Sequence, residues 1–205
     1  MFAKESFKWI ASPLALAAIV TSASLWFRST IGYVISSLLF LTTIFTAIFF
    51  RDPEREVGDG IVSPADGKIA FVDKEGRGLS IIMGLSNVHV TRAPHQGEVV
   101  SVKREDGRHQ PAFREVSETN ESVEIVISTR LGNFDITLIT GFMARRILPY
   151  VRVGDTLRKG ERIGIIRFGS RVNLQLPKSC RITAPLGRKV RAGESQIAEV
   201  IDGDS

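Results

Sequence analysis

A glycine and a serine at positions 169 and 170 form the stretch of this sequence best suited to chemistry on the chain itself. Apolar residues crowd both sides of the pair, and Val172–Leu176 alternates apolar and polar residues, as a strand with one buried face does. We therefore predict a tight joint between two strands. Glycine can adopt backbone angles closed to other residues, and a serine hydroxyl held against the preceding carbonyl can attack it. Gly-Ser is also an ordinary turn dipeptide, so the interpretation needs support from the rest of the chain.

Two further polar residues, an aspartate and a histidine, lie in contexts that predict ordered structure. Asp66 stands in a predicted turn between Pro64 and Gly67, and His89 stands in an extended segment rich in β-branched residues. By themselves, these contexts suggest a turn aspartate bonded to its own backbone and a structural histidine. The other two histidines, His95 after a proline and His109 in a polar loop, are predicted to be peripheral.

The composition narrows the class of protein. The 205 residues include 27 Lys and Arg against 22 Asp and Glu, and the resulting net charge of +5 favours an anionic partner. The single cysteine, Cys180, excludes an intrachain disulfide and a multi-cysteine metal site, and is interpreted as a small apolar filler. The sequence has no Walker loop, dinucleotide fingerprint or zinc-ligand pair, so we predict no metal.

Two apolar stretches at the N-terminus predict a membrane-anchoring helical hairpin over residues 1–50. Phe7–Phe27 carries only Lys8, and Ile31–Phe50 carries no charge, a length that at about 1.5 Å per residue crosses a hydrocarbon layer of about 30 Å. A cleaved signal peptide is a competing interpretation of the first stretch, weakened by the second run and the lack of a small-residue cleavage site. The first stretch, which contains several serines, is alternatively an interfacial helix.

Basic residues near the two spans predict the orientation of the chain. Lys4 and Lys8 precede the first span, Arg28 stands in the short link, and Arg51 and Arg55 follow the second. The positive-inside rule then puts both chain ends, with residues 51–205, on the cytoplasmic side of the cell membrane.

Residues 51–205 are predicted to form a mainly β domain, a sandwich or barrel with few helices, because short strands alternate with Gly and Pro turns. Helical spacing occurs in Phe142–Tyr150, and polar Glu105–Asn120 is predicted to be a surface loop. The predicted strands are Lys68–Val72, Leu79–Met83, Gly97–Arg104, Val123–Thr129, Phe134–Thr140, Arg162–Phe168, Arg171–Leu176 and Gln196–Val200.

Five short blocks along the chain occur together in a familiar order and spacing. They are Phe50-Arg51-Asp52-Pro53-Glu54-Arg55, Ser63-Pro64-Ala65-Asp66-Gly67, Asn87-Val88-His89-Val90-Thr91-Arg92-Ala93-Pro94, Gly141-Phe142-Met143-Ala144-Arg145-Arg146-Ile147 and Arg167-Phe168-Gly169-Ser170-Arg171. With these blocks the chain resembles, over nearly its whole length, the short-form phosphatidylserine decarboxylases, which are pyruvoyl-dependent membrane enzymes. Similar archaeal proteins of this length are assigned archaetidylserine, the ether lipid, as substrate.

The resemblance implies that the chain is a proenzyme that cuts itself at Gly169-Ser170 into a β chain, residues 1–169, and an α chain, residues 170–205. Ser170 would become the covalent pyruvoyl cofactor, whose carbonyl accepts the electrons released as carbon dioxide leaves an anionic serine phospholipid. The two chains would remain together as a heterodimer, and members of the family are often dimers of such units.

The resemblance also implies roles for the aspartate and the histidine. Asp66 and His89 match the family's motif positions, and we expect an imidazole oriented by a carboxylate to serve as the base for self-cleavage and as the later acid. Arg92, Arg145 and Arg146 are candidates for binding the phosphate or carboxylate of the lipid, with a structural charge as the alternative for each. Longer bacterial relatives have a second histidine where this chain has Arg92, so the roles of that histidine do not transfer.

Two interpretations from other classes of protein stay open at this point. The turn at Ser63–Gly67, together with Val153–Gly160, resembles the turns of biotinyl and lipoyl carrier domains, but the lysine tripeptide displayed by such carriers is not in the sequence. A membrane-anchored nucleic-acid binder would need aromatic residues interleaved with the basic ones, which are not found here, so we predict no nucleic-acid partner.

Overall fold

The structure is a computed structural model that describes residues 1–4, 6–107, 120–141, 146–167 and 170–201, with only the backbone of Ser170. The chain divides into two compact units, Met1–Glu54 and Arg55–Ser205.

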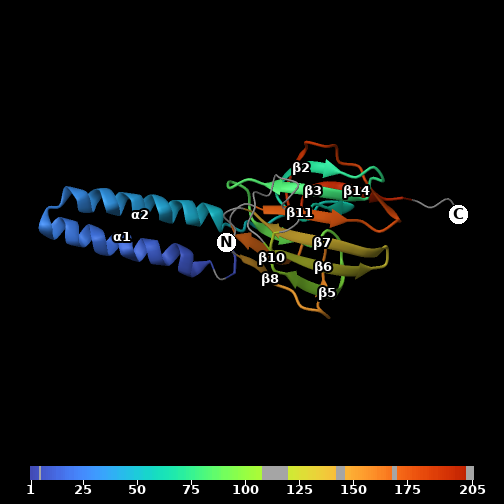
Figure 1. Cartoon of the computed structure of the whole chain (residues 1–205), viewed down its shortest axis with the longest axis horizontal. Helices are drawn as coiled ribbons and strands as arrows, with labels where there is room; N and C mark the ends of the chain where they lie inside the picture. The colour runs from blue at the N-terminus through green and yellow to red at the C-terminus, as the bar shows by residue number, and fades with distance from the viewer. Residues whose placement is uncertain (5, 108–119, 142–145, 168–169, 202–205) are drawn as a thin grey trace. The chain divides into compact units, whose positions relative to one another are not determined.

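The first unit is the helical hairpin predicted from the two apolar stretches (Figure 1). It consists of α1 (Phe7–Phe27) and α2 (Thr30–Phe49), each long and apolar enough to cross a membrane. Arg28 ends α1 in a left-handed conformation (φ 51°), and the Ser29 side chain accepts a hydrogen bond from the Gly32 N–H (3.2 Å) to cap α2. The hairpin turn therefore needs only two residues between the helices.

Small and polar residues line the contact between the two helices, while large apolar side chains are exposed. The Thr21 and Ser36 hydroxyls contact each other, and Ser36 also reaches the carbonyl of the buried Ala17 (3.3 Å). Most of the large aliphatic side chains are exposed, among them Leu14, Ile19, Leu38 and Leu41. This distribution, polar inside and apolar outside, is the one expected of helices packed against each other in lipid.

The second unit is mainly β, as predicted, and the strands among its described residues form three sheets (Figure 1). The strands are β1 (Ile61–Val62), β2 (Gly67–Val72), β3 (Gly78–Met83), β4 (Val90–Arg92), β5 (Gly97–Glu105), β6 (Ser122–Thr129), β7 (Gly132–Thr140), β8 (Arg146–Pro149), β9 (Thr156–Leu157), β10 (Arg162–Arg167), β11 (Ser170–Gln175), β12 (Cys180–Ile182), β13 (Lys189–Val190) and β14 (Gln196–Val200). The sheets have the orders β13-β2-β3-β11-β7-β6-β5-β9, β4-β10-β8 and β1-β14-β12.

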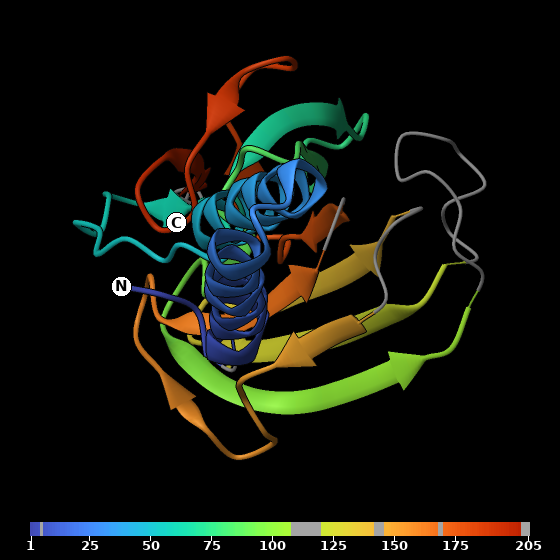
Figure 2. The same ribbon diagram turned by 90° about the vertical axis from the view of Figure 1, so that its left-hand side faces the viewer.

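The large sheet curves around the hydrophobic core, most visibly along the yellow-green strand β5 (Figure 2). A register shift between Val99 and Ser101 contributes to this bending. Along β6, buried and half-buried residues alternate, so that one face packs inward, as a strand covered on one side requires. The core residues include Ile69, Ile81, Val123, Ile125, Ile127, Phe134, Ile136, Leu138, Val172 and Leu174.

The joint predicted between two strands at position 170 lies at a change of sheet. β10 is the middle strand of one small sheet, paired with β4 and β8. β11, which begins at Ser170, is an inner strand of the large sheet, paired along its whole length with β3 and β7. Both arms of the joint are therefore fixed by neighbours on both sides. Gly169 lies outside the described residues.

One sequence prediction about the fold is wrong in its described part. Helical spacing was expected over Phe142–Tyr150, but Arg146–Pro149 is strand β8, and residues 142–145 lie outside the described residues. The apolar Ile147 is fully buried, and its strand pairs with β10. Tertiary pairing therefore overrides a short helical pattern here, as is common for segments of a few residues. The expected surface loop lies mostly in 108–119, also outside the described residues.

The fold predicts that cleavage between residues 169 and 170 would not separate the two products. Strands β11, β13 and β14 of the segment 170–205 pair with β3, β7, β2 and β1 of the segment before it. Pulling the smaller fragment away would expose the large core, so we expect both fragments to co-elute in mild detergent and to separate only in denaturant. Loss of the small fragment during native gel filtration would contradict this pairing.

Candidate functional site

The backbone of Ser170 lies between two buried residues at one end of the large sheet. Its neighbours across the strands are Met83 in β3 and Thr140 in β7, whose side chains are almost fully buried. The Thr140 hydroxyl donates to the Glu121 carbonyl (3.1 Å), and the Asn120 side chain donates to the Thr140 carbonyl (2.7 Å). The backbone pairing with β3 and β7 and the side-chain hydrogen bonds at Thr140 therefore both hold the surroundings of Ser170 in place.

His89 is brought close in the fold to the strand that leads to Ser170. It immediately precedes β4, and its carbonyl accepts a hydrogen bond from the Ile166 N–H near the end of β10 (3.2 Å). The imidazole is fully buried, and its Nδ1 lies 2.9 Å from the Asn87 carbonyl oxygen. Because a carbonyl oxygen only accepts, Nδ1 must carry a proton, which makes Nε2 the basic atom of the neutral ring.

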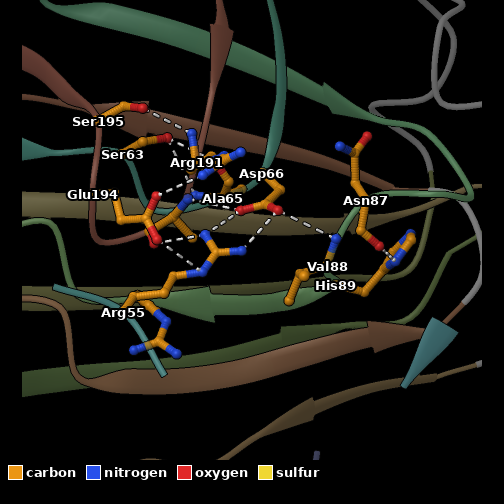
Figure 3. Close-up of polar contacts among 12 residues, drawn as sticks. Arg55, Ser63, Ala65, Asp66, Asn87, Val88, His89, Arg191, Glu194 and Ser195 are labelled. Atoms are coloured by element: carbon orange, nitrogen blue, oxygen red, sulfur yellow. Dashed lines mark hydrogen bonds and ion pairs between the residues drawn. The ribbon is translucent and has the colours of Figure 1, made fainter. Parts of the chain in front are cut away.

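Asp66 has different partners from the imidazole expected from the sequence. Its Oδ1 accepts hydrogen bonds from Arg55 (2.6 Å) and the Ala192 N–H (2.8 Å), and its Oδ2 accepts from Arg55 (2.9 Å) and the Val88 N–H (3.3 Å) (Figure 3). Four donors fill the four acceptor positions of a carboxylate. These partners are remote in sequence, so the simple turn aspartate is not what the structure shows either.

Arg55 is the residue of this cluster that sequence reasoning missed. Its side chain is only 5 % exposed and forms a two-pronged ion pair with Asp66; it also donates to the Ala192 carbonyl (2.9 Å) and lies 3.7 Å from Glu194 (Figure 3). Removing one partner of such a buried pair costs about 3–5 kcal/mol. In the sequence, Arg55 is a positive charge near a membrane span and the last residue of the first of the five blocks, and nothing local marks this charge as buried.

The three arginines expected to bind substrate lie in different environments. Arg92 is buried in β4 and donates to the Gly160 carbonyl (3.0 Å), which agrees with the structural alternative. Arg146 is exposed at the start of β8 and pairs in register with Arg167 of β10, beside the joint. Arg145 lies outside the described residues. Of the two whose placement is described, Arg146 is the one available to a ligand.

His95 and Cys180 have contacts other than those of the Arg55–Asp66 cluster. The His95 ring stacks on the core residue Phe134, with centroids 5.6 Å apart, and its Nδ1 lies 2.9 Å from the Gln96 carbonyl. His109 lies outside the described residues. Cys180 is fully buried in the core, and burial raises the pKa of its thiol, which confirms its prediction as an apolar filler.

Comparison with known proteins identifies the family. The family model described as phosphatidylserine decarboxylase matches residues 42–198. A protein of Archaeoglobus fulgidus, assigned as an archaetidylserine decarboxylase proenzyme, is 48% identical over 78% of this chain and 81% of its own length. A protein of Methanococcoides burtonii with the same assignment is 41% identical over 97% of this chain and 96% of its own.

A bacterial relative carries the other lipid in its name. The phosphatidylserine decarboxylase proenzyme of Streptomyces coelicolor is 47% identical over 73% of this chain and 70% of its own length. With the family model covering most of the mainly β unit, the chain belongs to the phosphatidylserine decarboxylase family.

The contrasting environments of His89 and His95 give a matched pair of variants. If His89 moves the proton, His89→Ala should slow both self-cleavage and turnover by about 10²–10⁴-fold, the usual contribution of a positioned acid or base. His95→Ala removes a stacked ring from the far end of β7 and should cleave and turn over within a few-fold of wild type. Gel densitometry measures the rate of self-cleavage and carbon dioxide release measures the rate of turnover. Equal rates in the His89→Ala and wild-type proteins would remove His89 from the chemistry.

Proposed function

We propose that this protein is a pyruvoyl-dependent decarboxylase that converts a serine phospholipid to the ethanolamine phospholipid. The observation that carries the proposal is the position of Ser170, at the first residue of a strand paired on both sides, in a chain of the phosphatidylserine decarboxylase family. The relatives' shared description as proenzymes supports a step of self-processing. A lipoyl-like or biotinyl-like carrier is not supported by these relatives.

In the proposed self-cleavage, the Ser170 oxygen attacks the Gly169 carbonyl carbon and the Gly169–Ser170 amide bond breaks. The proton of the hydroxyl passes to a base, and the amine leaves protonated, so an ester replaces the amide. Loss of the Ser170 α-proton then breaks the ester to leave a carboxylate at Gly169 and a dehydroalanine. Hydrolysis of the dehydroalanine releases ammonia and leaves the pyruvoyl group at the new N-terminus.

His89 is the base that the described geometry supports. Its Nδ1–H is fixed on the Asn87 carbonyl, so Nε2 is the nitrogen able to take and return a proton. The His89 carbonyl accepts a hydrogen bond from Ile166, one residue before the end of β10, so the histidine is held against the strand that leads to Ser170. Asp66, which this geometry ties to the backbone beside His89, is proposed to act as a positioning residue.

The backbone around Ser170 suits a reactive group at a new chain end. β11 remains paired with β3 and β7 after a cut, so the new terminus would stay fixed beside the buried Met83 and Thr140. A bound pyruvoyl group supplies the electron-accepting carbonyl for decarboxylation. The protein contributes binding, orientation and the proton that replaces carbon dioxide, and His89 is the proposed source of that proton.

The proposed substrate is an anionic serine phospholipid, phosphatidylserine or its ether counterpart archaetidylserine. The relatives named after these two lipids are almost equally similar to this chain, and both lipids have a serine head group. The two apolar helices support association with the membrane in which such a lipid lies. Arg146, exposed at the start of β8, is the described arginine best suited to the phosphate, and Arg145 is its neighbour in sequence.

Self-cleavage is tested by a variant that lacks the Ser170 hydroxyl. Ser170→Ala should remain one chain of 22.6 kDa with no decarboxylase activity, because no other group can form the ester or become the keto acid. Wild type should yield fragments 1–169 and 170–205 and release carbon dioxide from vesicles of phosphatidylserine or archaetidylserine. Ser179→Ala, which removes another hydroxyl of the smaller fragment, is the control and should behave as wild type. An uncut wild-type chain that decarboxylates either lipid would refute the pyruvoyl mechanism.

The proposed orientation puts residues 51–205 on the cytoplasmic side of the cell membrane, following the basic residues that flank the helices. The protein should therefore need detergent for extraction, and protease added to sealed cells should leave this portion intact. Permeabilised cells serve as the control, since the same protease should then digest it. Digestion of this portion in sealed cells would show that the proposed orientation is wrong.

A further inference from the structure

A single peptide group stands between the Asp66 carboxylate and the His89 ring. The N–H of this group, on Val88, donates to Asp66 Oδ2 (3.3 Å), and its carbonyl, on Asn87, accepts from His89 Nδ1 (2.9 Å) (Figure 3). The N–H and the carbonyl of a trans peptide point in opposite directions. The carboxylate and the imidazole therefore bind the two ends of the same dipole.

Hydrogen bonds at the two ends of a peptide strengthen each other. An N–H that donates to a carboxylate pushes electron density onto its own carbonyl, which then becomes a better acceptor for the imidazole N–H. The carboxylate in turn is held by the planar fork of Arg55, whose two nitrogens match its two oxygens. The contacts thus form one connected series: Arg55, Asp66, the Asn87–Val88 peptide and His89.

Resting on the proposed function, we propose that this peptide couples the Arg55–Asp66 ion pair to His89, and that Arg55 is a positioning residue of the reaction. The ion pair fixes the plane of the peptide, and the peptide fixes the tautomer and direction of the imidazole. Arg55 also holds the Ala192 carbonyl, and Asp66 holds the Ala192 N–H. The same pair therefore anchors the smaller product to the segment that carries His89.

Substitutions of Arg55 test the first step of the series. Arg55→Met leaves Asp66 without its fork and should slow self-cleavage by about 100-fold, the effect of a misplacement of about 1 Å at a catalytic group. Arg55→Lys keeps the charge but not the fork and should give an intermediate rate. Arg191→Met, which removes an exposed arginine facing Glu194, is the control and should cleave at the wild-type rate.

A second variant addresses the risk that a lone buried carboxylate prevents folding. Arg55→Met combined with Asp66→Leu replaces both charges by apolar side chains, and proteins often tolerate such a replacement of a buried ion pair. This double variant should fold, as judged by a cooperative thermal transition, and still cleave slowly because the Val88 N–H has lost its acceptor. Wild-type cleavage in the folded double variant would overturn the coupling.

An amide-to-ester exchange tests the peptide itself without changing any side chain. Incorporating the α-hydroxy acid equivalent of valine at position 88 removes the N–H that donates to Asp66, and should slow self-cleavage as Arg55→Met does. The same exchange at Val99, whose N–H donates to the Asp155 carbonyl (2.9 Å), is the matched control and should leave the rate unchanged. Slow self-cleavage of the protein with the ester at position 99, or wild-type self-cleavage of the protein with the ester at position 88, would overturn the proposal.

The histidine tautomer gives a readout that does not depend on activity. Nitrogen NMR of the full chain labelled at its three histidines, in the uncleaved Ser170→Ala form, should show His89 protonated at Nδ1. Adding Arg55→Met should shift the His89 signals and leave those of His95 in place, whereas a purely structural arginine would move neither selectively. Unchanged His89 signals would refute the coupling. If wild type never cleaves, the proposed function fails while this spectrum still tests the coupling.

Discussion

The pairing of β11 on both sides is the constraint on which the rest of the structure depends. This strand begins at Ser170 and lies inside the large sheet, whereas β10, just before it, belongs to a different sheet. Because β11 is paired on both sides and β10 is paired with β8 as far as Arg167, neither strand is free to shift. The arrangement allows a bond in the joint to be cut without loss of the fold, because the pairing of both arms outlasts the bond.

The buried ion pair of Arg55 and Asp66 gives the second unit a polar centre that serves both stability and the proposed chemistry. It binds the backbone at Ala192 on one side and at Val88 on the other. The first contact belongs to the smaller predicted fragment, and the second belongs to the segment that presents His89. One charged cluster thus connects the part of the chain that carries Ser170 with the part that carries the proposed base.

The sequence predicted the two helices, most of the longer strands and the joint at Ser170, because hydrophobic periodicity reports which faces are buried. It did not predict the strand at Arg146–Pro149, where pairing with β10 overrides a helical pattern. It also paired Asp66 directly with His89. Residue types and motif positions identify candidate groups. They do not show that Arg55, eleven residues earlier, forms an ion pair with Asp66, or that a peptide group stands between Asp66 and His89. Such contacts depend on the three-dimensional path of loops, which no local pattern records.

The measurement that tests the central claim most directly is the mass of the fragment that begins at residue 170, taken from purified wild-type protein under denaturing conditions. A pyruvoyl group in place of serine makes this fragment lighter by one ammonia than the same fragment with an ordinary serine terminus, and it blocks Edman degradation because no amine remains. We predict this lower mass and this resistance to Edman degradation. A fragment that starts with unmodified serine, or a single intact chain in an active preparation, would contradict the account.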